Sequence, residues 1–308
     1  MKVWVNGVFH NDKDANISVF DAGIQHGVGL FETVHARNGV VFRGKQHMDR
    51  LAESATLLRL TEQLQIDPLV EALQLCVTEN NQDSARLRLT LTGGNLNMLQ
   101  KTGSGVKDPT IIIQSQPPTE YPAALFEKGV VVSLASGRGN PYDLMAGHKT
   151  LNYWSRLLNL QLSAAQKCGE ALWLSQSAHI VGGSVSNVFL VKNNTLITPV
   201  ARGEETAKDV PSAVLPGITR DVVLSLASDM GMAIDRCNST LDEFLDADEA
   251  FLTNSSWGVL PVVGVTATVQ DQGKATSELQ QVGSGSVGAQ TNTLRRKYWE
   301  LVETETSG

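Results

Sequence analysis

Lys149 is the residue whose type and position could do chemistry by itself. It lies in the stretch GHKTLNYW, at a predicted loop-to-helix junction, and Tyr153 follows four residues later. Side chains four residues apart on a helix share a face. A partly desolvated lysine amine is a nucleophile that forms imines with carbonyl compounds. Without its surroundings, Lys149 also has the pattern of an ordinary surface lysine at a helix start.

Three other stretches have the composition of anion-binding sites. In LPGITR, Gly217 permits close backbone approach, and the helix that follows would present free N–H groups to a phosphate. Thr253-Asn-Ser-Ser256 offers three hydroxyls after a strand, and Arg50 is a cation on an amphipathic helix. The stretch VGGSVSN, residues 181–187, combines two glycines with hydroxyls. Each of these also fits a plain loop, a solvated turn or a solvated arginine.

The bulk composition limits the classes of function. The chain has 308 residues and a formal net charge of −7, so no basic face for nucleic acid is evident. Its three cysteines are widely spaced and form no metal-ligand pattern, which fits a reducing compartment and predicts no metal site. The first residues lack a signal-peptide core, and no apolar run is long enough to span a membrane. A cytoplasmic protein is expected.

The elements that must position these residues form two blocks. Hairpins are predicted at Asn6-Gly7 and Asn38-Gly39, followed by a helix over KQHMDRLAESATLLRL and a second helix with Asp67 as N-cap and Pro68 in its first turn. ARLRLTLTG and TIIIQSQ read as strands. The proline-rich segment 117–122 predicts a linker. This divides the chain into an N-terminal α/β domain, 1–116, and a C-terminal domain, 123–308.

The second block mixes strands and helices. Strands are predicted at VVVSLAS, ALWLS, SNVFLVK, TLITP, EAFLTN and VVGVTATV. Helices are predicted from Asn152 to Lys167, from Gly217 to Gly231, and over TLRRKYWELV, and Thr240 and Glu243 form a possible capping box. The pattern indicates an α+β protein.

Six stretches in this order resemble the fold-type IV pyridoxal-phosphate enzymes. They are DAGIQHGVGLFETV, HMDRLAES, HKTLNYW, SNVFLVKNNTLITP, LPGITR and FLTNSSWGVLPV. The family includes branched-chain aminotransferases, D-amino-acid transaminases and aminodeoxychorismate lyases. The resemblance implies a smaller N-terminal α/β sandwich, a larger C-terminal pseudo-barrel and pyridoxal 5′-phosphate as cofactor. It also implies a homodimer with the site at the domain junction of each subunit, acting on a small-molecule amino acid and keto acid.

The resemblance assigns roles residue by residue. Lys149 matches the lysine that holds the cofactor as an aldimine and then acts as acid and base. Arg50 matches the arginine that pairs with the cofactor phosphate. The phosphate cradle matches Gly217, Ile218 and Thr219, and its far side matches Ser255 and Ser256. The tyrosine near the phenolic oxygen matches Tyr153, and the loop beneath the ring matches Gly182, Ser186 and Asn187. The substrate-facing strand matches Phe31 and Thr33. Arg88, on the next strand, is a further candidate for a substrate carboxylate.

Gly182 is a departure from the family pattern. Five residues before the asparagine of SNVF the family has a glutamate, which faces the pyridine nitrogen and keeps it protonated. No acid lies between Ala171 and Lys192 here. The link at 200–214 looks longer than the family's and contains Glu204 and Glu205, which could supply the charge or lie on a solvated loop. Alternatively, the nitrogen stays neutral, or the protein binds the cofactor without turnover.

An aminotransferase acting on a small, branched-chain-like amino acid and 2-keto acid pair is the predicted function. The alternatives are a 4-amino-4-deoxychorismate lyase, favoured by KTLN at the lysine, and a catalytically impaired cofactor-binding homologue. The predicted substrate loop, residues 92–98, lacks the Arg-x-His pair of D-amino-acid transaminases, which argues against that activity.

Overall fold

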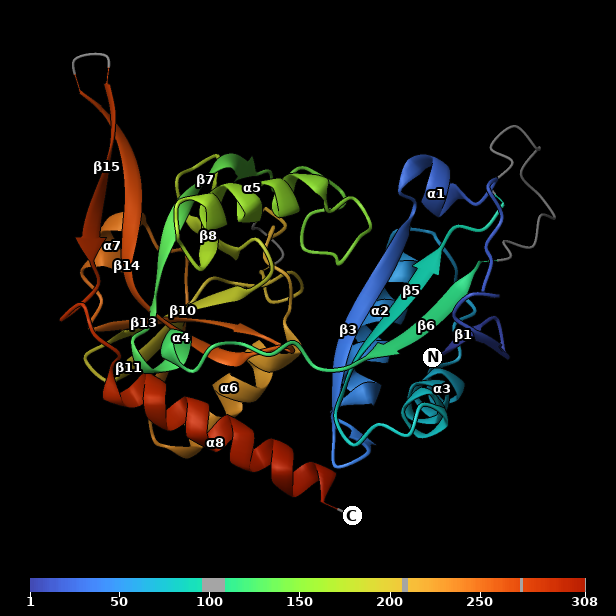
Figure 1. The fold of residues 1–308 in the computed structure, drawn as a ribbon. Coiled ribbons are helices and arrows are strands. Elements are labelled where there is room, and N and C mark those ends of the chain that lie inside the picture. The colour runs from blue at the N-terminus through green and yellow to red at the C-terminus, as the bar shows by residue number, and fades with distance from the viewer. Residues whose placement is uncertain (96–108, 207–209, 272–273, 308) are drawn as a thin grey trace. The chain divides into compact units, whose positions relative to one another are not determined.

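A computed structural model describes residues 1–95, 109–206, 210–271 and 274–307 (Figure 1). The chain divides into two compact units. The first contains Met1–Thr119, His148–Asn152 and Leu301–Gly308, and the second contains Glu120–Gly147 and Tyr153–Glu300. Lys149 therefore belongs to the first unit, although the segments that flank His148–Asn152 on both sides belong to the second.

The first unit is built on a six-stranded sheet with the order β2-β1-β6-β5-β3-β4 (Figure 1). The two Asn-Gly turns make hairpins as predicted, because Asn and Gly accept the positive φ angles that such turns need. The strands are β1 (Lys2–Val5), β2 (Val8–Asn11), β3 (Gly29–Arg37), β4 (Val40–Val41), β5 (Ala85–Thr92) and β6 (Ile111–Gln116).

Helices α2 (Gly44–Leu57) and α3 (Ile66–Glu79) pack on this sheet and enclose one apolar core. Helix α3 begins at Ile66 with Gln65 as its N-cap, so the prediction of Asp67 as N-cap was wrong. Pro68 still lies in the first turn, where its missing N–H costs nothing. A short helix, α1 (Ala22–His26), precedes β3 and is capped by the side chain of Asp21.

The second unit contains a nine-stranded sheet that curls on itself. Its order is β12-β11-β10-β13-β14-β7-β8-β9, with β15 also paired to β14. Four strands separate β9 (Ile180–Gly183) from β10 (Asn187–Lys192) in this order, yet only Ser184, Val185 and Ser186 join them along the chain. Such a short link requires the sheet to curl back towards closure. The result is a mixed α+β fold with a half-barrel, as predicted.

The other strands of this sheet are β7 (Val130–Gly139), β8 (Glu170–Ser175), β11 (Thr195–Thr198), β12 (Ala233–Arg236), β13 (Glu249–Asn254), β14 (Gly258–Asp271) and β15 (Lys274–Gln281). The helices are α4 (Ala124–Glu127), α5 (Trp154–Ala165), α6 (Ile218–Asp229), α7 (Leu241–Leu245) and α8 (Ala289–Thr306). The predicted capping box of Thr240 and Glu243 is present at α7. Among the described residues, no helix has the length and apolarity that crossing a membrane requires.

Candidate functional site

Lys149 is held by backbone pairing to β3. Phe31 N–H donates to the Lys149 carbonyl at 2.9 Å, Leu151 N–H donates to the Gly29 carbonyl at 2.9 Å, and Thr150 forms an antiparallel bridge with Leu30. The segment is extended and α5 begins only at Trp154, so the prediction that Lys149 and Tyr153 share a helix face was wrong. The pairing fixes the lysine more firmly than a fraying helix start would. Its Nζ lies 4.6 Å from the centre of the Phe31 ring.

Arg50 pairs with a buried glutamate that the sequence analysis did not single out. Its Nε donates to Oε1 of Glu32 at 2.9 Å and its Nη2 donates to Oε2 at 2.6 Å, a bidentate contact. His47 Nδ1 lies 2.7 Å from the same Oε2. All three residues are buried, on β3 and α2. Glu32 thus orients the face of α2 that carries Arg50.

The protonation of this cluster follows from its contacts. Burial by itself would raise the pKa of Glu32, but the Arg50 charge and the His47 hydrogen bond lower it to about 2. Burial lowers the pKa of His47 below its ordinary value, although its bond to Glu32 opposes this. At neutral pH the cluster is therefore an ionised carboxylate held between a guanidinium and an imidazole.

The predicted substrate residues lie together on the sheet of the first unit. Phe31 and Thr33 are two residues apart on β3, so their side chains lie on the same face of the sheet. Thr33 is paired directly with Arg88 on β5, which places the Arg88 side chain on that face as well. The Arg88 guanidinium lies 3.9 Å from the centre of the Phe31 ring, and its Nε donates to Thr90 Oγ1 at 3.3 Å. Residues 96–98 of the predicted substrate loop lie outside the described residues.

In the second unit, the predicted phosphate cradle opens α6. Gly217 is the N-cap and has no side-chain cap, so the first-turn N–H groups of Ile218 and Thr219 are those that a helix leaves without an intrahelical partner. Asn187 donates from Nδ2 to the Leu215 carbonyl at 2.8 Å, and a Cβ atom on Gly217 would collide with Oδ1 of Asn187. A larger residue at Gly217 would therefore displace the Asn187 side chain.

The turn after β13 contains the other predicted hydroxyls. Asn254 Oδ1 accepts from the N–H groups of Ser256 and Trp257, at 2.8 and 3.0 Å, which shapes the turn that carries Ser255. Thr253 precedes it, and β13 pairs Thr253 with Asn187 of β10. The Thr253 hydroxyl is buried and has no hydrogen-bond partner within the described part of the chain. A buried hydroxyl normally has a partner, so this one is free to donate to a ligand.

The stretch VGGSVSN forms the end of β9 and its tight turn into β10. Gly182 has φ +143°, in a region that favours glycine, and a Cβ atom there would lie 2.8 Å from the Ser186 carbonyl oxygen. A glutamate could not occupy this position without moving the backbone. A side chain at this position would therefore require a different backbone conformation of the turn.

The buried carboxylate of Glu170 accepts hydrogen bonds from this turn. Its Oε1 accepts from the N–H groups of Ala171 and Ser184, and its Oε2 accepts from the Val185 N–H and the Ser186 hydroxyl at 3.2 and 3.1 Å. Burial raises the pKa of Glu170, and these hydrogen bonds offset only part of that effect. The turn at Gly182, which has no acidic residue of its own, is thus organised around the carboxylate of Glu170.

Side chains at the start of α5 and on β8 also donate hydrogen bonds to this turn. The Tyr153 hydroxyl donates to the Ser184 carbonyl at 3.0 Å, and Arg156 Nη1 donates to the Gly183 carbonyl at 3.0 Å. Trp173, directly opposite Gly182 across the strands, donates from Nε1 to the Ser184 hydroxyl at 2.9 Å. These donors fix the loop's carbonyl groups and its hydroxyl.

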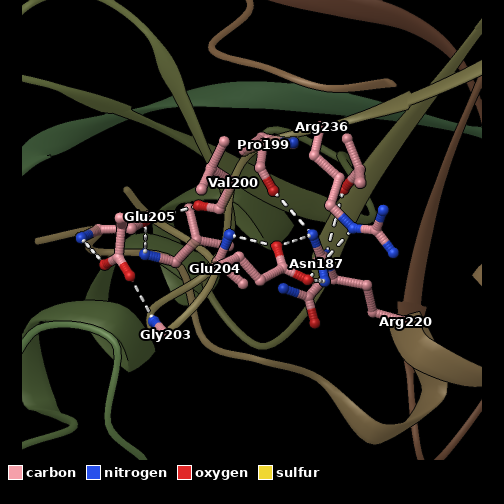
Figure 2. Close-up of polar contacts among 12 residues, drawn as sticks. Asn187, Pro199, Val200, Gly203, Glu204, Glu205, Arg220 and Arg236 are labelled. Atoms are coloured by element: carbon pink, nitrogen blue, oxygen red, sulfur yellow. Dashed lines mark hydrogen bonds and ion pairs between the residues drawn. The ribbon is translucent and has the colours of Figure 1, made fainter. Parts of the chain in front are cut away.

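Glu204 and Glu205 are both engaged within the second unit (Figure 2). Glu204 accepts a bidentate pair from Arg220, at 2.8 and 2.7 Å, and lies 3.3 Å from Arg236 Nε. Glu205 accepts from the N–H groups of Gly203 and Ser212 in its own loop. These contacts give no support to the prediction that either one supplies the missing pyridine-nitrogen charge.

Glu32 could have been found from the sequence, because it interrupts an apolar face. With a period of two, Leu30, Glu32 and Val34 share one side of β3, and a carboxylate among buried apolar residues needs a cation. The partner, Arg50, lies on the next predicted helix. Glu170 gave no such signal, since its partners are backbone N–H groups of a turn more than ten residues away.

Comparisons with known proteins extend these observations. The family model "Amino-transferase class IV" matches residues 29–265. The chain is 34% identical over 98% of its length to a Methanocaldococcus jannaschii protein, covering 96% of it, whose assignment as a branched-chain-amino-acid aminotransferase is provisional. It also resembles the crystal structure of the Escherichia coli branched-chain amino acid aminotransferase, with 28% identity, a TM-score of 0.85 and coverage of 99% and 96% of the two chains.

A third likeness comes from a ligand complex. The structure of the T.th. branched-chain amino acid aminotransferase with pyridoxamine 5′-phosphate is 25% identical, with a TM-score of 0.80 and coverage of 98% and 93% of the two chains. The family model covers most of the chain, including the Lys149 segment, the turn at Gly182 and the opening of α6. The protein belongs to the class IV aminotransferase family.

Proposed function

We propose that this protein is a pyridoxal-phosphate-dependent aminotransferase that acts on a branched-chain-like amino acid and 2-keto acid pair. The observation that carries the proposal is Lys149, a lysine whose segment is fixed to β3 by two backbone hydrogen bonds, one of them at its own carbonyl, with its amine over the Phe31 ring. The substrate class comes from the names of the relatives.

The residues present fit the cofactor. Ile218 and Thr219 offer first-turn N–H groups behind Gly217, where a side chain would displace Asn187, and the buried Thr253 hydroxyl lacks a partner within the described part of the chain. A 5′-phosphate meets such donors well. When bound, pyridoxal phosphate serves as the electron sink for the substrate α-carbon.

The chain's own residues would supply the other functions. The Lys149 amine would hold the cofactor and move a proton at the substrate α-carbon. Arg50, oriented by Glu32, would add positive charge for the phosphate. Ser255 and Ser256 would add hydroxyls for it, and Tyr153 would be the residue assigned to the phenolic oxygen. Phe31 and Thr33 border the substrate, and Arg88 receives a substrate carboxylate.

We further propose that the pyridine nitrogen works without a carboxylate partner. The conformation of Gly182 excludes a side chain, and Glu204 and Glu205 are engaged elsewhere. Glu170 contacts the turn through neutral donors, so the loop presents backbone and hydroxyl groups, with Ser186 and Asn187 at its end. Such a site would make the bound cofactor a weaker electron sink.

A visible absorption spectrum tests the reaction class. The purified protein should show a band of bound pyridoxal phosphate that bleaches when leucine, isoleucine or valine is added and returns with a 2-keto acid. A band that is inert to amino acids, together with p-aminobenzoate formed from aminodeoxychorismate, would favour the lyase. An inert band without product would show an impaired homologue.

We also propose a cytoplasmic homodimer. Helix α5 presents an apolar face to solvent, where Trp154 is 71% exposed and Leu157, Leu158 and Leu162 are 40–46% exposed. Their spacing makes one continuous stripe, and a second copy of the chain would cover it. Sedimentation of the protein should give twice the chain mass, and Leu158→Glu should lower that value.

A further inference from the structure

We propose that Glu204 is a positioning residue for the cofactor phosphate: it fixes Arg220, and through Arg220 the opening turn of α6. This inference rests on the proposed cofactor. It gives a role to the loop at 200–214, which the sequence analysis left open between a source of charge and a solvated surface. Figure 2 shows the contacts that carry it.

Arg220 is a buried cation with one carboxylate partner among the described residues. Its side chain is 3% exposed, whereas that of Glu204 is 28% exposed. Besides the bidentate pair with Glu204, Arg220 donates to the Pro199 carbonyl at 3.0 Å and to Thr198 Oγ1 at 3.4 Å. Neutral oxygens alone do not offset the burial of a guanidinium, so Glu204 is the group that keeps it in place.

Arg220 follows Thr219 directly in the first turn of α6. A Cβ atom on Gly217 would lie 3.2 Å from Cβ of Arg220, so the arginine packs against the N-cap itself. Asn187, the first residue of β10, donates to the carbonyl of Leu215, two residues before the N-cap Gly217. The N–H groups proposed to receive the phosphate are thus clamped by Asn187 before the helix and by the Arg220–Glu204 pair within it.

Hydrogen bonds within the loop at 200–214 hold Glu204 beside Arg220. Its ends are tied together by Arg202 N–H to the Val214 carbonyl at 2.9 Å and by the Ser212 hydroxyl to the Val200 carbonyl at 2.6 Å. Glu204 also accepts from the Ala201 N–H at 2.8 Å. Glu205 serves the loop's own backbone, and residues 207–209 lie outside the described part.

The charge state of Glu204 agrees with this role. Burial would raise its pKa, but the hydrogen bonds and charges of Arg220 and the Ala201 N–H lower it below the ordinary value. The groups that face it are Arg220, Arg236 and that N–H. Glu204 therefore stays ionised wherever the enzyme is studied near neutral pH.

The test separates binding of the phosphate from binding of the ring. The dissociation constants of pyridoxal 5′-phosphate and of pyridoxal are measured by absorbance for the full-length apoprotein and for Glu204→Gln. The dissociation constant of pyridoxal divided by that of pyridoxal 5′-phosphate reports the contribution of the phosphate, and this ratio cancels a general loss of folded protein. We expect Glu204→Gln to lower this ratio about tenfold, the scale of one lost charge-assisted contact, and Glu204→Asp to restore part of it.

Glu205→Gln is the matched control, since it changes the neighbouring carboxylate of the same loop. It should leave the ratio unchanged. In an Arg220→Lys background, which cannot make the bidentate pair, Glu204→Gln should add little, because both changes remove the same contact. An unchanged ratio in Glu204→Gln, or an equal loss in Glu205→Gln, would overturn the inference.

Melting temperature with inorganic phosphate separates this inference from the proposed function. Phosphate should stabilise the wild-type apoprotein and Glu205→Gln, and should stabilise Glu204→Gln less. If this pattern holds while pyridoxal phosphate never attaches to Lys149, the proposed function fails and the positioning role stands. If phosphate stabilises all three proteins equally, the positioning role fails.

Discussion

Glu32 in the first unit and Glu170 in the second are both buried glutamates, but their pKa values are displaced in opposite directions. The pKa of Glu32 falls to about 2, and that of Glu170 rises. Burial raises the pKa of both. The difference lies in the partners: Glu32 contacts Arg50 and His47, whereas Glu170 accepts from backbone N–H groups and a serine hydroxyl.

The comparison shows how the two regions are organised. Around Glu32, the ion pair between its carboxylate and the Arg50 guanidinium holds α2 against β3 and fixes the orientation of the Arg50 side chain. Around Glu170, neutral donors hold a turn in which the φ angle of Gly182 disfavours any side chain. One region is held by ionic contacts, and the other by hydrogen bonds from neutral groups.

Glu32→Gln should have the largest effect on stability, because it leaves the buried Arg50 charge without its carboxylate. We expect a loss of about 3–5 kcal/mol in the free energy of unfolding, measured by urea denaturation. Glu53→Gln, an exposed change on the same helix, should cost less than about 0.5 kcal/mol. If the two variants unfold alike, the ion pair is not what holds α2.

The pH profile of stability should reveal the same ion pair. Because the pKa of Glu32 is lowered on folding, its contribution is present above about pH 4.5 and is lost as the pH falls towards 2. That loss amounts to about 3 kcal/mol. Urea midpoints measured at stepped pH should show this slope in the wild type and a reduced slope in Glu32→Gln. Equal slopes would contradict the assignment.

Gly182→Ala should destabilise the protein by about 1–3 kcal/mol, since it adds a strained φ angle and a close contact with the Ser186 carbonyl. Gly7→Ala, at φ +93° with open space around it, controls for the φ angle alone. Thermal melting compares the two. Gly182→Glu should be no more stable than Gly182→Ala; a stable Gly182→Glu protein would show that the loop can return to the family's arrangement.

Glu170→Gln should have a smaller effect, about 1–2 kcal/mol, because an amide keeps one acceptor but turns an NH₂ group towards the Val185 N–H. The contribution of Glu170 to the free energy of unfolding should depend on pH in the direction opposite to that of Glu32. A raised pKa gives stability that is full below about pH 4.5 and is lost as the pH rises through the folded-state value. Chemical denaturation at several pH values checks the sign, and a profile like that of Glu32→Gln would contradict the comparison.

The parts of the fold predicted from the sequence were those set by local chemistry. The Asn-Gly hairpins, the α2 helix and the capping box at Thr240 depend on residues close together in the chain. The pairing of Lys149 with β3 could not be predicted, because it joins segments more than one hundred residues apart. The role of Glu204 depends likewise on where a fifteen-residue loop folds back.

Covalent attachment at Lys149 tests the central claim most directly. The purified protein is incubated with pyridoxal 5′-phosphate, reduced with sodium borohydride, digested and analysed by peptide mass spectrometry, with Lys149→Ala as the control. The account predicts a phosphopyridoxyl group on Lys149 in the wild type and none at other lysines in the variant. A wild-type protein with Lys149 unmodified would contradict it.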